Sequence, residues 1–256
     1  MSAGQIETPD LGRLAIRLRE LITTGPGRKL TAAGPERLIE YRQSFSERAR
    51  EKTVVLREDT ALELGPPQCA SVNAVVWTRE RAAVKDRSVT LIGPDLDEPG
   101  QPERDYAQII LLGLPEEAEV NPFKLEAVQY LSHRLPGVMA RLIPGRLWLR
   151  VSREALAAGL NFSLLAGALL ERYQEEAPGV SGEFVFVSGL RLEVERFSAL
   201  AAEARILTGR HQKIILSQSG EYECEELNCE SCGEKVVCDR IREVAQIRRR
   251  ERAGPG

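Results

Sequence analysis

Several kinds of residue and segment are scarce in this chain of 256 residues, and each shortage excludes a class of protein. There are only two histidines, His133 and His211, so a multi-histidine metal site or a histidine-dependent enzyme has few candidate residues. No apolar run approaches the roughly 18 residues that mark a transmembrane helix. The polar segment 1–9 also lacks the apolar stretch of a signal peptide. These absences predict a cytoplasmic protein without a membrane-spanning segment.

A large excess of charge of one sign is also missing. The chain has 35 basic and 38 acidic residues, which gives a net charge of −3. This net charge disfavours a basic domain that binds nucleic acid. Hydrophobic residues (43%) and charged residues (29%) are balanced as in globular proteins, which excludes disorder as the main state. Only six of the basic residues are lysines. This arginine bias is explained by genome composition or heat tolerance, with bidentate phosphate binding as the alternative.

Hydrophobic periodicity predicts helices at the N-terminus and a mixed α/β body after them. Helices are expected over 10–23, 35–52, 121–134, 152–158, 162–175 and 190–207, with Ser152 and Asn161 as N-caps. Apolar residues expected to face inward from the second helix are Leu38, Ile39 and Phe45. Strands are expected over 53–56, 70–77, 88–92, 106–112, 146–151, 183–187 and 213–216. The predicted fold class is α/β or α+β, with a mixed sheet flanked by helices.

The same changes in pattern predict three parts. Residues 1–52 form an N-terminal helical segment, and residues 53–217 form the α/β domain. Residues 218–256 form a small metal-binding segment, in which a four-cysteine loop leads into a basic helix.

Four of the five cysteines lie close together: Cys224, Cys229, Cys232 and Cys238, with the spacing C-x4-C-x2-C-x5-C. Four thiols this close in a reducing compartment favour a metal site over disulfides, because thiolates are soft ligands for zinc and iron–sulfur clusters. Structural zinc usually takes two CxxC pairs, whereas a single CxxC with wider flanks is more typical of a [4Fe–4S] cluster. We therefore predict a [4Fe–4S] cluster, with zinc as the alternative and redox disulfides as a third possibility.

A similar four-cysteine spacing occurs in DNA glycosylases of the endonuclease III type, together with a helix-hairpin-helix. The stretch Leu135-Pro136-Gly137-Val138 overlaps the core of that hairpin. Against this alternative, Met139 replaces the second hairpin glycine, the first cysteine gap is four residues rather than six, and no aspartate occurs between Asp105 and Asp239. An endonuclease III-like relative is therefore the weaker alternative.

Several stretches resemble the non-catalytic domain of the CO dehydrogenase/acetyl-CoA synthase β subunit. They are ALELGPPQCASVNAVVW (61–77), VTLIGPDLDE (89–98), RLWLRVSREALAAGLNFSLLAGALLERYQEEAPGV (146–180) and FVFVSGLRLEVERF (184–197). The resemblance implies a relative of this scaffold domain in anaerobic one-carbon or acetyl-CoA metabolism. It also implies CoA, or proteins of the CO dehydrogenase/acetyl-CoA synthase type, as partners.

The sequence differs from that family in the residues that bind its metal. The synthase needs a Cys-Gly-Cys element for its distal nickel, and this sequence contains none. Acetyl-CoA synthesis by this chain alone is therefore not expected, and an accessory, electron-transfer or CoA-binding role is the prediction. No P-loop, G-x-G-x-x-G or HExxH motif indicates a particular reaction, so whether the chain is an enzyme stays open.

A few further residues could bind a ligand. Arg141, Arg146 and Arg150 could line an anionic pocket, or they could be outward arginines of an ordinary strand. Trp148 is expected in the core, with stacking on an adenine as the alternative. Cys69, which stands apart from the other cysteines, is expected to be a small buried hydrophobe rather than a reactive thiol.

Overall fold

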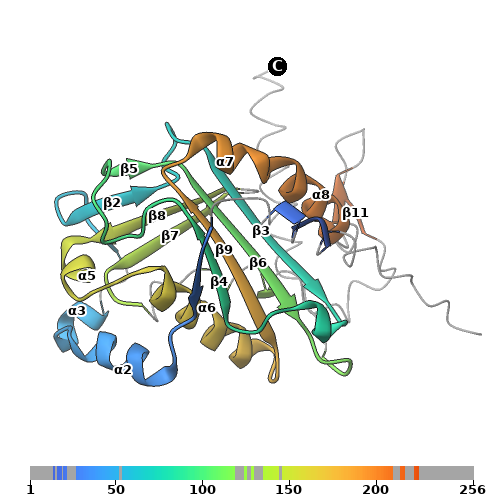
Figure 1. Ribbon diagram of the computed structural model, residues 1–256, viewed down its shortest axis with the longest axis horizontal. Helices are drawn as coiled ribbons and strands as arrows, with labels where there is room; N and C mark the ends of the chain where they lie inside the picture. The colour runs from blue at the N-terminus through green and yellow to red at the C-terminus, as the bar shows by residue number, and fades with distance from the viewer. Residues whose placement is uncertain are drawn as a thin grey trace, which may run out of the picture. The chain divides into compact units, whose positions relative to one another are not determined.

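The computed structural model describes residues 14, 16–18, 20–21, 27–51, 54–118, 124–125, 128–129, 135–143, 146–209, 214–216 and 222–224. Two mixed sheets and the helices that flank them confirm the predicted mixed α/β class (Figure 1). The chain divides into two compact units, Met1–Leu207 and Thr208–Gly256. The three predicted parts, 1–52, 53–217 and 218–256, stay predictions. No helix among the described residues is long and apolar enough to cross a membrane.

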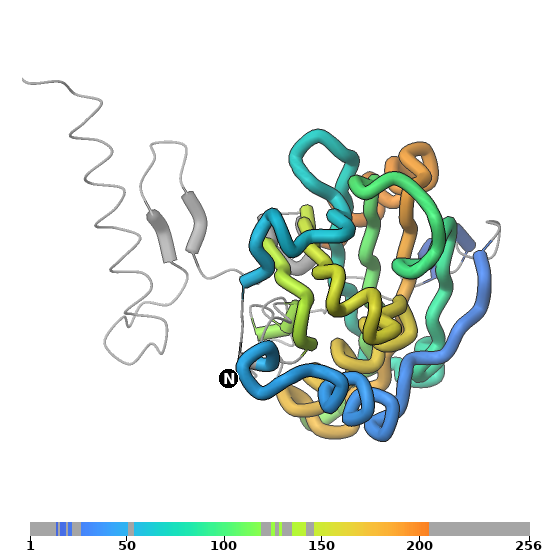
Figure 2. Tube along the Cα trace, turned by 90° about the vertical axis from the view of Figure 1, so that its left-hand side faces the viewer, coloured from blue at the N-terminus to red at the C-terminus, as the bar shows by residue number. Residues whose placement is uncertain are grey.

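The larger sheet has five strands in the order β1-β4-β9-β6-β3. These strands are β1 (Arg28–Thr31), β3 (Ser71–Thr78), β4 (Ser88–Ile92), β6 (Tyr106–Gly113) and β9 (Ser181–Ser188). The central pair, β6 and β9, is antiparallel, whereas β3 runs parallel to β6 and β4 runs parallel to β9. The short strand β1 forms the outer edge, antiparallel to β4 (blue, at the right of Figure 2).

Both faces of this sheet are covered, because every residue of β6 and of β9 is buried. Such near-continuous apolar strands are typical of sheets that are covered on both sides. Helix α6 (Phe162–Glu176) covers one face, where the ring of Phe162 stacks on Phe186 with 4.7 Å between ring centres. The predicted cap of this helix is confirmed, since Asn161 Oδ1 accepts a hydrogen bond of 3.0 Å from the Leu164 amide.

The smaller sheet has the order β5-β2-β8-β7. Its strands are β2 (Thr60–Leu64), β5 (Glu103–Arg104), β7 (Val138–Ile143) and β8 (Arg146–Ser152). Along β8 burial alternates, so that Leu147, Leu149 and Val151 are buried while the residues between them are half-buried. Ser71 of β3 connects the two sheets, because its hydroxyl donates to the Leu147 carbonyl at 2.7 Å and accepts from the Leu147 amide at 3.0 Å.

The remaining elements are short. In the first unit they are α2 (Pro35–Gln43), α3 (Glu47–Glu51), the 3-10 helix η1 (Arg81–Ala83), α5 (Arg153–Ala157), α7 (Arg191–Arg196) and α8 (Ser198–Gly209), whose last residues cross into the second unit. The described residues among 14–21 are helical, as predicted, with Leu14 and Leu18 buried. In the second unit, β10 (Ile214–Leu216) pairs antiparallel with β11 (Tyr222–Cys224), which confirms the predicted strand near 213–216.

Two of the predicted helices are each divided in two. The helix expected over 35–52 stops at Ser44, whose hydroxyl donates to the Tyr41 carbonyl, and restarts after Ser46. Such side-chain hydrogen bonds compete with the helix backbone. The expectation that Ile39 faces inward is wrong, because the buried side is set by Leu38 and Tyr41, three residues apart. The helix expected over 190–207 is divided at Phe197 into α7 and α8.

The strand predicted over 53–56 is also wrong. The described residues Val54 to Leu56 have no strand partner, and Val54 and Leu56 are 57% and 49% exposed. Most of the helix predicted over 121–134 lies outside the described residues.

Candidate functional site

Three arginines and a tryptophan line one face of the smaller sheet. Arg146, Trp148 and Arg150 alternate along β8 with residues that are buried, so they share the opposite face of the strand. Arg141 of β7 lies directly opposite Trp148 in the antiparallel pair. The strand prediction and the alternating pattern are therefore both confirmed, and Trp148 is half-buried rather than a core residue.

The tryptophan ring lies close to two guanidinium groups. The Cζ atom of Arg150 is 4.7 Å from the centre of the Trp148 ring, and the Cζ atom of Arg141 is 5.3 Å from it. Both distances fall within the ~6 Å range of cation–π attraction. The ring therefore helps to hold two positive charges side by side, where they would otherwise repel each other.

Glu63 of β2 fixes this arrangement from the neighbouring strand. Its Oε2 accepts a hydrogen bond of 2.9 Å from the indole Nε1 of Trp148, and its Oε1 accepts one of 3.0 Å from Nε of Arg150. The side chains of Glu63 and Arg150 are only 14% and 20% exposed, so this ion pair is partly shielded from water. The hydrogen bond from Arg150 to Glu63 uses Nε. The two terminal nitrogens of Arg150 make no hydrogen bond to another described residue.

We call Glu63, Arg141, Arg146, Trp148 and Arg150 the arginine–tryptophan face. Three guanidinium groups share this face with two carboxylates, those of Glu63 and of its β5 partner Glu103, so the surface carries a positive excess of one charge. Planar guanidinium groups bind phosphates and carboxylates through two parallel hydrogen bonds, and they also stack on ring systems. This chemistry suits a ligand that combines an anionic group with a flat ring.

Glu63 was not foreseen from the sequence. It lies 85 residues from Trp148, among many other glutamates, and only the pairing of β2 with β8 brings the two together. An acidic residue in a short apolar stretch, TALEL, is the one signal that could have pointed to it.

Cys69 lies next to this face. One terminal nitrogen of Arg146 donates a hydrogen bond of 2.9 Å to the Cys69 carbonyl. The thiol is half-buried rather than fully buried as predicted, and burial raises its pKa, with further contributions from Asp105 and Glu103. A raised pKa keeps the thiol protonated and poorly nucleophilic, in agreement with the prediction of an unreactive cysteine.

The predicted metal ligands fall mostly outside the structure described above. Cys224 ends β11, opposite Ile214, whereas Cys229, Cys232 and Cys238 lie outside the described residues. Within the described residues, no group of three or more histidine, cysteine, aspartate or glutamate side chains could hold a metal ion. The four-cysteine ligand set therefore stays a prediction.

The alternative of an endonuclease III-like glycosylase is contradicted by the fold. Leu135, Pro136 and Gly137 form a turn that leads into strand β7, where a helix-hairpin-helix requires a second helix. The backbone at Gly137 is left-handed, but its neighbours pair with β8 in a sheet.

Residues 45–184 match the family model of the CO dehydrogenase/acetyl-CoA synthase complex beta subunit. The chain belongs to this family. The match to the beta-subunit family covers the whole arginine–tryptophan face and ends within β9, and the four clustered cysteines lie beyond it. A comparison with curated proteins finds no match. The family resemblance expected from the sequence is thus confirmed.

Proposed function

We propose that this member of the beta-subunit family is an accessory protein of acetyl-CoA metabolism that binds CoA on the arginine–tryptophan face. The observation that carries the proposal is the pair of guanidinium groups of Arg141 and Arg150 beside the Trp148 ring, at 5.3 and 4.7 Å. CoA carries a 3′-phosphate, a pyrophosphate and an adenine ring. Guanidinium groups suit the phosphates, and the indole and guanidinium planes suit the flat base.

The two tryptophans of the chain allow a direct test. Trp77 lies in β3 and is only 8% exposed, so the variant Trp77→Phe leaves Trp148 as the sole tryptophan, whose fluorescence can be excited selectively over that of the tyrosines. In this background, CoA is expected to quench the fluorescence saturably. Dephospho-CoA is expected to bind more weakly, and pantetheine is expected not to bind, since it lacks the phosphates.

Variants of the arginines provide the matched comparison. We expect Arg141→Gln/Arg150→Gln to weaken CoA binding at least tenfold, because each lost charge-assisted hydrogen bond contributes about 1.5–3 kcal/mol. Arg57→Gln, at an exposed arginine outside this face, serves as the control and should leave binding unchanged. Equal affinity of the double variant and the wild type would contradict the assignment.

A second proposal concerns the cysteine loop. The spacing of Cys224, Cys229, Cys232 and Cys238 supports a bound [4Fe–4S] cluster, with zinc as the alternative. When bound, such a cluster transfers single electrons or ties the loop into one structure. Protein purified without oxygen should be brown and contain about four iron atoms per chain.

The lone cysteine supplies the control for this experiment. Replacing any of the four loop cysteines by serine should abolish iron binding, whereas Cys69→Ser should leave the iron content unchanged. A colourless protein with one zinc ion would contradict the cluster and support the alternative. Unchanged metal content in all four serine variants would contradict both.

The family name places beta subunits in a CO dehydrogenase/acetyl-CoA synthase complex. We propose partners of that type for this chain and assign it no catalytic step, because the sequence contains no Cys-Gly-Cys element. The proposed role is thus to bind CoA and to carry a metal centre beside such enzymes.

A further inference from the structure

Glu63 places a negative charge within a face that otherwise suits an anion. Its position in β2 is directly opposite Arg150 of β8, so the two side chains share one face of the smaller sheet. By charge alone, a carboxylate in this place opposes the binding of phosphate groups. Any favourable effect of Glu63 on an anionic ligand must therefore act through the side chains that it holds.

The side chains of Glu63, Trp148 and Arg150 each contact the other two. The two carboxylate oxygens of Glu63 accept one hydrogen bond from the indole Nε1 of Trp148, at 2.9 Å, and one from Nε of Arg150, at 3.0 Å. The Arg150 Cζ atom is in turn 4.7 Å from the centre of the indole ring. None of the three side chains can change its rotamer without losing both of its contacts.

The hydrogen bond to Glu63 uses only part of the Arg150 guanidinium. A guanidinium has five N–H groups in a fixed plane, and the carboxylate takes the one on Nε. The two terminal nitrogens, which form the fork that binds a phosphate through two parallel hydrogen bonds, make no hydrogen bond to another described residue. Glu63 thus fixes the direction of Arg150 and leaves its fork available.

Arg141 shows what an arginine on this face lacks without such a carboxylate. It is exposed, and it makes no hydrogen bond or ion pair with another described residue, so only the Trp148 ring orients it. The side chain of Arg150 is 20% exposed and is held by both Glu63 and the ring. Because ordering a long side chain costs affinity when a ligand binds, Arg150 is the better prepared of the two.

We propose that Glu63 is a positioning residue for an anion, which holds Arg150 so that its two terminal nitrogens meet a phosphate group of CoA. The inference rests on the proposed binding of CoA to the arginine–tryptophan face. It adds that the order imposed on Arg150 strengthens binding by more than the negative charge of Glu63 weakens it.

The test compares Glu63→Gln with the full wild-type chain by isothermal titration calorimetry with CoA. Glutamine has the same size but no charge, and its single acceptor oxygen cannot replace both carboxylate oxygens. We expect the affinity for CoA to fall about five- to tenfold, because Arg150 must then be ordered by the ligand. The loss of a negative charge alone would give the opposite result, a tighter complex.

Glu103 provides the control that is matched in charge. It lies directly opposite Glu63 in the parallel pair of β2 and β5, so it shares the same face, but its carboxylate accepts a hydrogen bond from Gln68. No hydrogen bond or ion pair links it to Arg150 or Trp148 in the described part of the chain. Glu103→Gln should therefore bind CoA at least as tightly as the wild type does.

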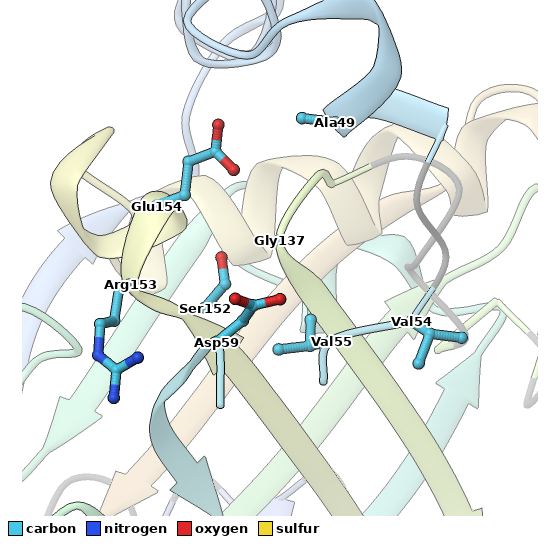
Figure 3. A pocket seen from close by; sticks show the side chains of 8 residues that line it. All are labelled: Ala49, Val54, Val55, Asp59, Gly137, Ser152, Arg153 and Glu154. Carbon is cyan, nitrogen blue, oxygen red and sulfur yellow. The ribbon is translucent and has the colours of Figure 1, made fainter. Parts of the chain in front are cut away.

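A second control removes a carboxylate outside the arginine–tryptophan face. Glu154 of α5 lines a cavity with Ala49, Val55 and Ser152, and it shares no contact with Glu63 (Figure 3). Glu154→Gln should leave the affinity for CoA unchanged. The two controls together separate the effect of position from the effect of net charge.

The decisive measurement repeats the substitution without Arg150. In an Arg150→Gln background Glu63 has no guanidinium to position, and only its unfavourable charge acts on the ligand. We therefore expect Glu63→Gln to tighten CoA binding in this background, although it weakens binding in the wild type. A merely structural role of Glu63 would weaken binding in both backgrounds, since the two losses would then be independent.

Circular dichroism checks that each variant is folded. If Glu63→Gln does not fold, Glu63→Asp takes its place, because aspartate keeps the charge but is too short to reach both donors. Affinity equal to or tighter than that of the wild type, or the same loss in both backgrounds, would overturn the positioning role alone. Absence of CoA binding by the wild type would overturn the proposed function as well.

Discussion

Gly137 adopts a backbone conformation that residues with a side chain rarely tolerate. Its φ is +74°, and an added Cβ would lie 2.5 Å from the Ser152 Oγ and 2.8 Å from the Ala155 Cβ. We expect Gly137→Ala to lower the free energy of unfolding by about 2–3 kcal/mol, through backbone strain and the clash together. Urea denaturation measures this loss.

A substitution at Gly159 separates the backbone strain from the steric clash, which act together at Gly137. Its φ is +84°, but an added Cβ would meet nothing within 4 Å. Gly159→Ala should therefore cost only the backbone strain, about 1–2 kcal/mol. Equal losses at the two glycines would show that the contact with Ser152 does not contribute.

Asp95 makes stability depend on pH. Its carboxylate accepts hydrogen bonds from the amides of Phe162 (2.9 Å) and Leu96 (2.7 Å), but burial has the larger effect and raises the pKa of Asp95. The folded state then binds the proton more tightly than the unfolded chain. The contribution of Asp95 to stability is therefore full below the ordinary pKa of aspartate, about 3.9, and is lost as pH rises through the raised value.

The variant Asp95→Asn isolates this contribution. We expect the free energy of unfolding of the wild type, measured relative to the variant, to fall as pH rises from about 3 toward neutrality. Urea denaturation at a series of pH values gives both curves. A relative stability that increases with pH would mean that the two amide hydrogen bonds outweigh burial.

Single residues of the candidate site were only partly predictable. Arg141, Arg146 and Arg150 stand close together in the sequence around Trp148, so they were foreseen as possible anion ligands. Glu63, which positions Trp148 and Arg150, was not. Its role depends on strand pairing across 85 residues, and sequence pattern carries no information about that pairing.

At the level of elements, helix α6 illustrates a cap that the sequence identifies correctly. Asn161 accepts a hydrogen bond from the Leu164 amide, which would otherwise have no partner in the helix. We expect Asn161→Ala to lower the free energy of unfolding by about 1 kcal/mol, measured by urea denaturation. Asn161→Asp, which retains the capping oxygen, should cost much less. Equal losses would indicate that the cap contributes little.

Some of the strands that were missed differ physically from those that were predicted. Strands β3, β4, β6, β8 and β9 are rich in valine, isoleucine and leucine, because their residues pack in the core. The edge strand β1, RKLT, has two charged residues, and β5 has only two residues, so neither shows a pattern. Strands β2 (TALEL) and β7 (VMARLI) were also missed, although their composition is apolar. Conversely, residues 53–56 have strand-like composition but no partner strand. The amino-acid composition of a segment indicates whether it is buried. Whether it pairs as a strand depends on the other strands that the fold places beside it.

At the level of the whole molecule, the hydrophobic core and the clustered cysteines belong to different units. The core residues lie within Met1–Leu207, and the four cysteines lie in Thr208–Gly256. We expect Cys229→Ser/Cys232→Ser to lose the proposed metal centre and yet to keep the main thermal transition within about 2 °C of the wild type, because apolar burial stabilises the first unit. Circular dichroism measures the transition.

A substitution in the hydrophobic core gives the fall in the thermal transition with which the double cysteine variant is compared. Leu111 is fully buried in β6, and Leu111→Ala should lower the transition by at least about 5 °C. A comparable fall in the double cysteine variant would contradict the expected independence and show that metal binding stabilises the first unit.

The order of the larger sheet has a consequence for the speed of folding. Its central antiparallel pair joins β6 to β9, which begins 68 residues after β6 ends. The chain loses conformational entropy when it closes this long loop, before the contacts between β6 and β9 can stabilise it. Folding rates therefore fall as contacting residues become more distant in sequence. During synthesis on the ribosome, β3, β4 and β6 therefore wait with unpaired edges until β9 emerges, and this interval is when the chain is most exposed to aggregation.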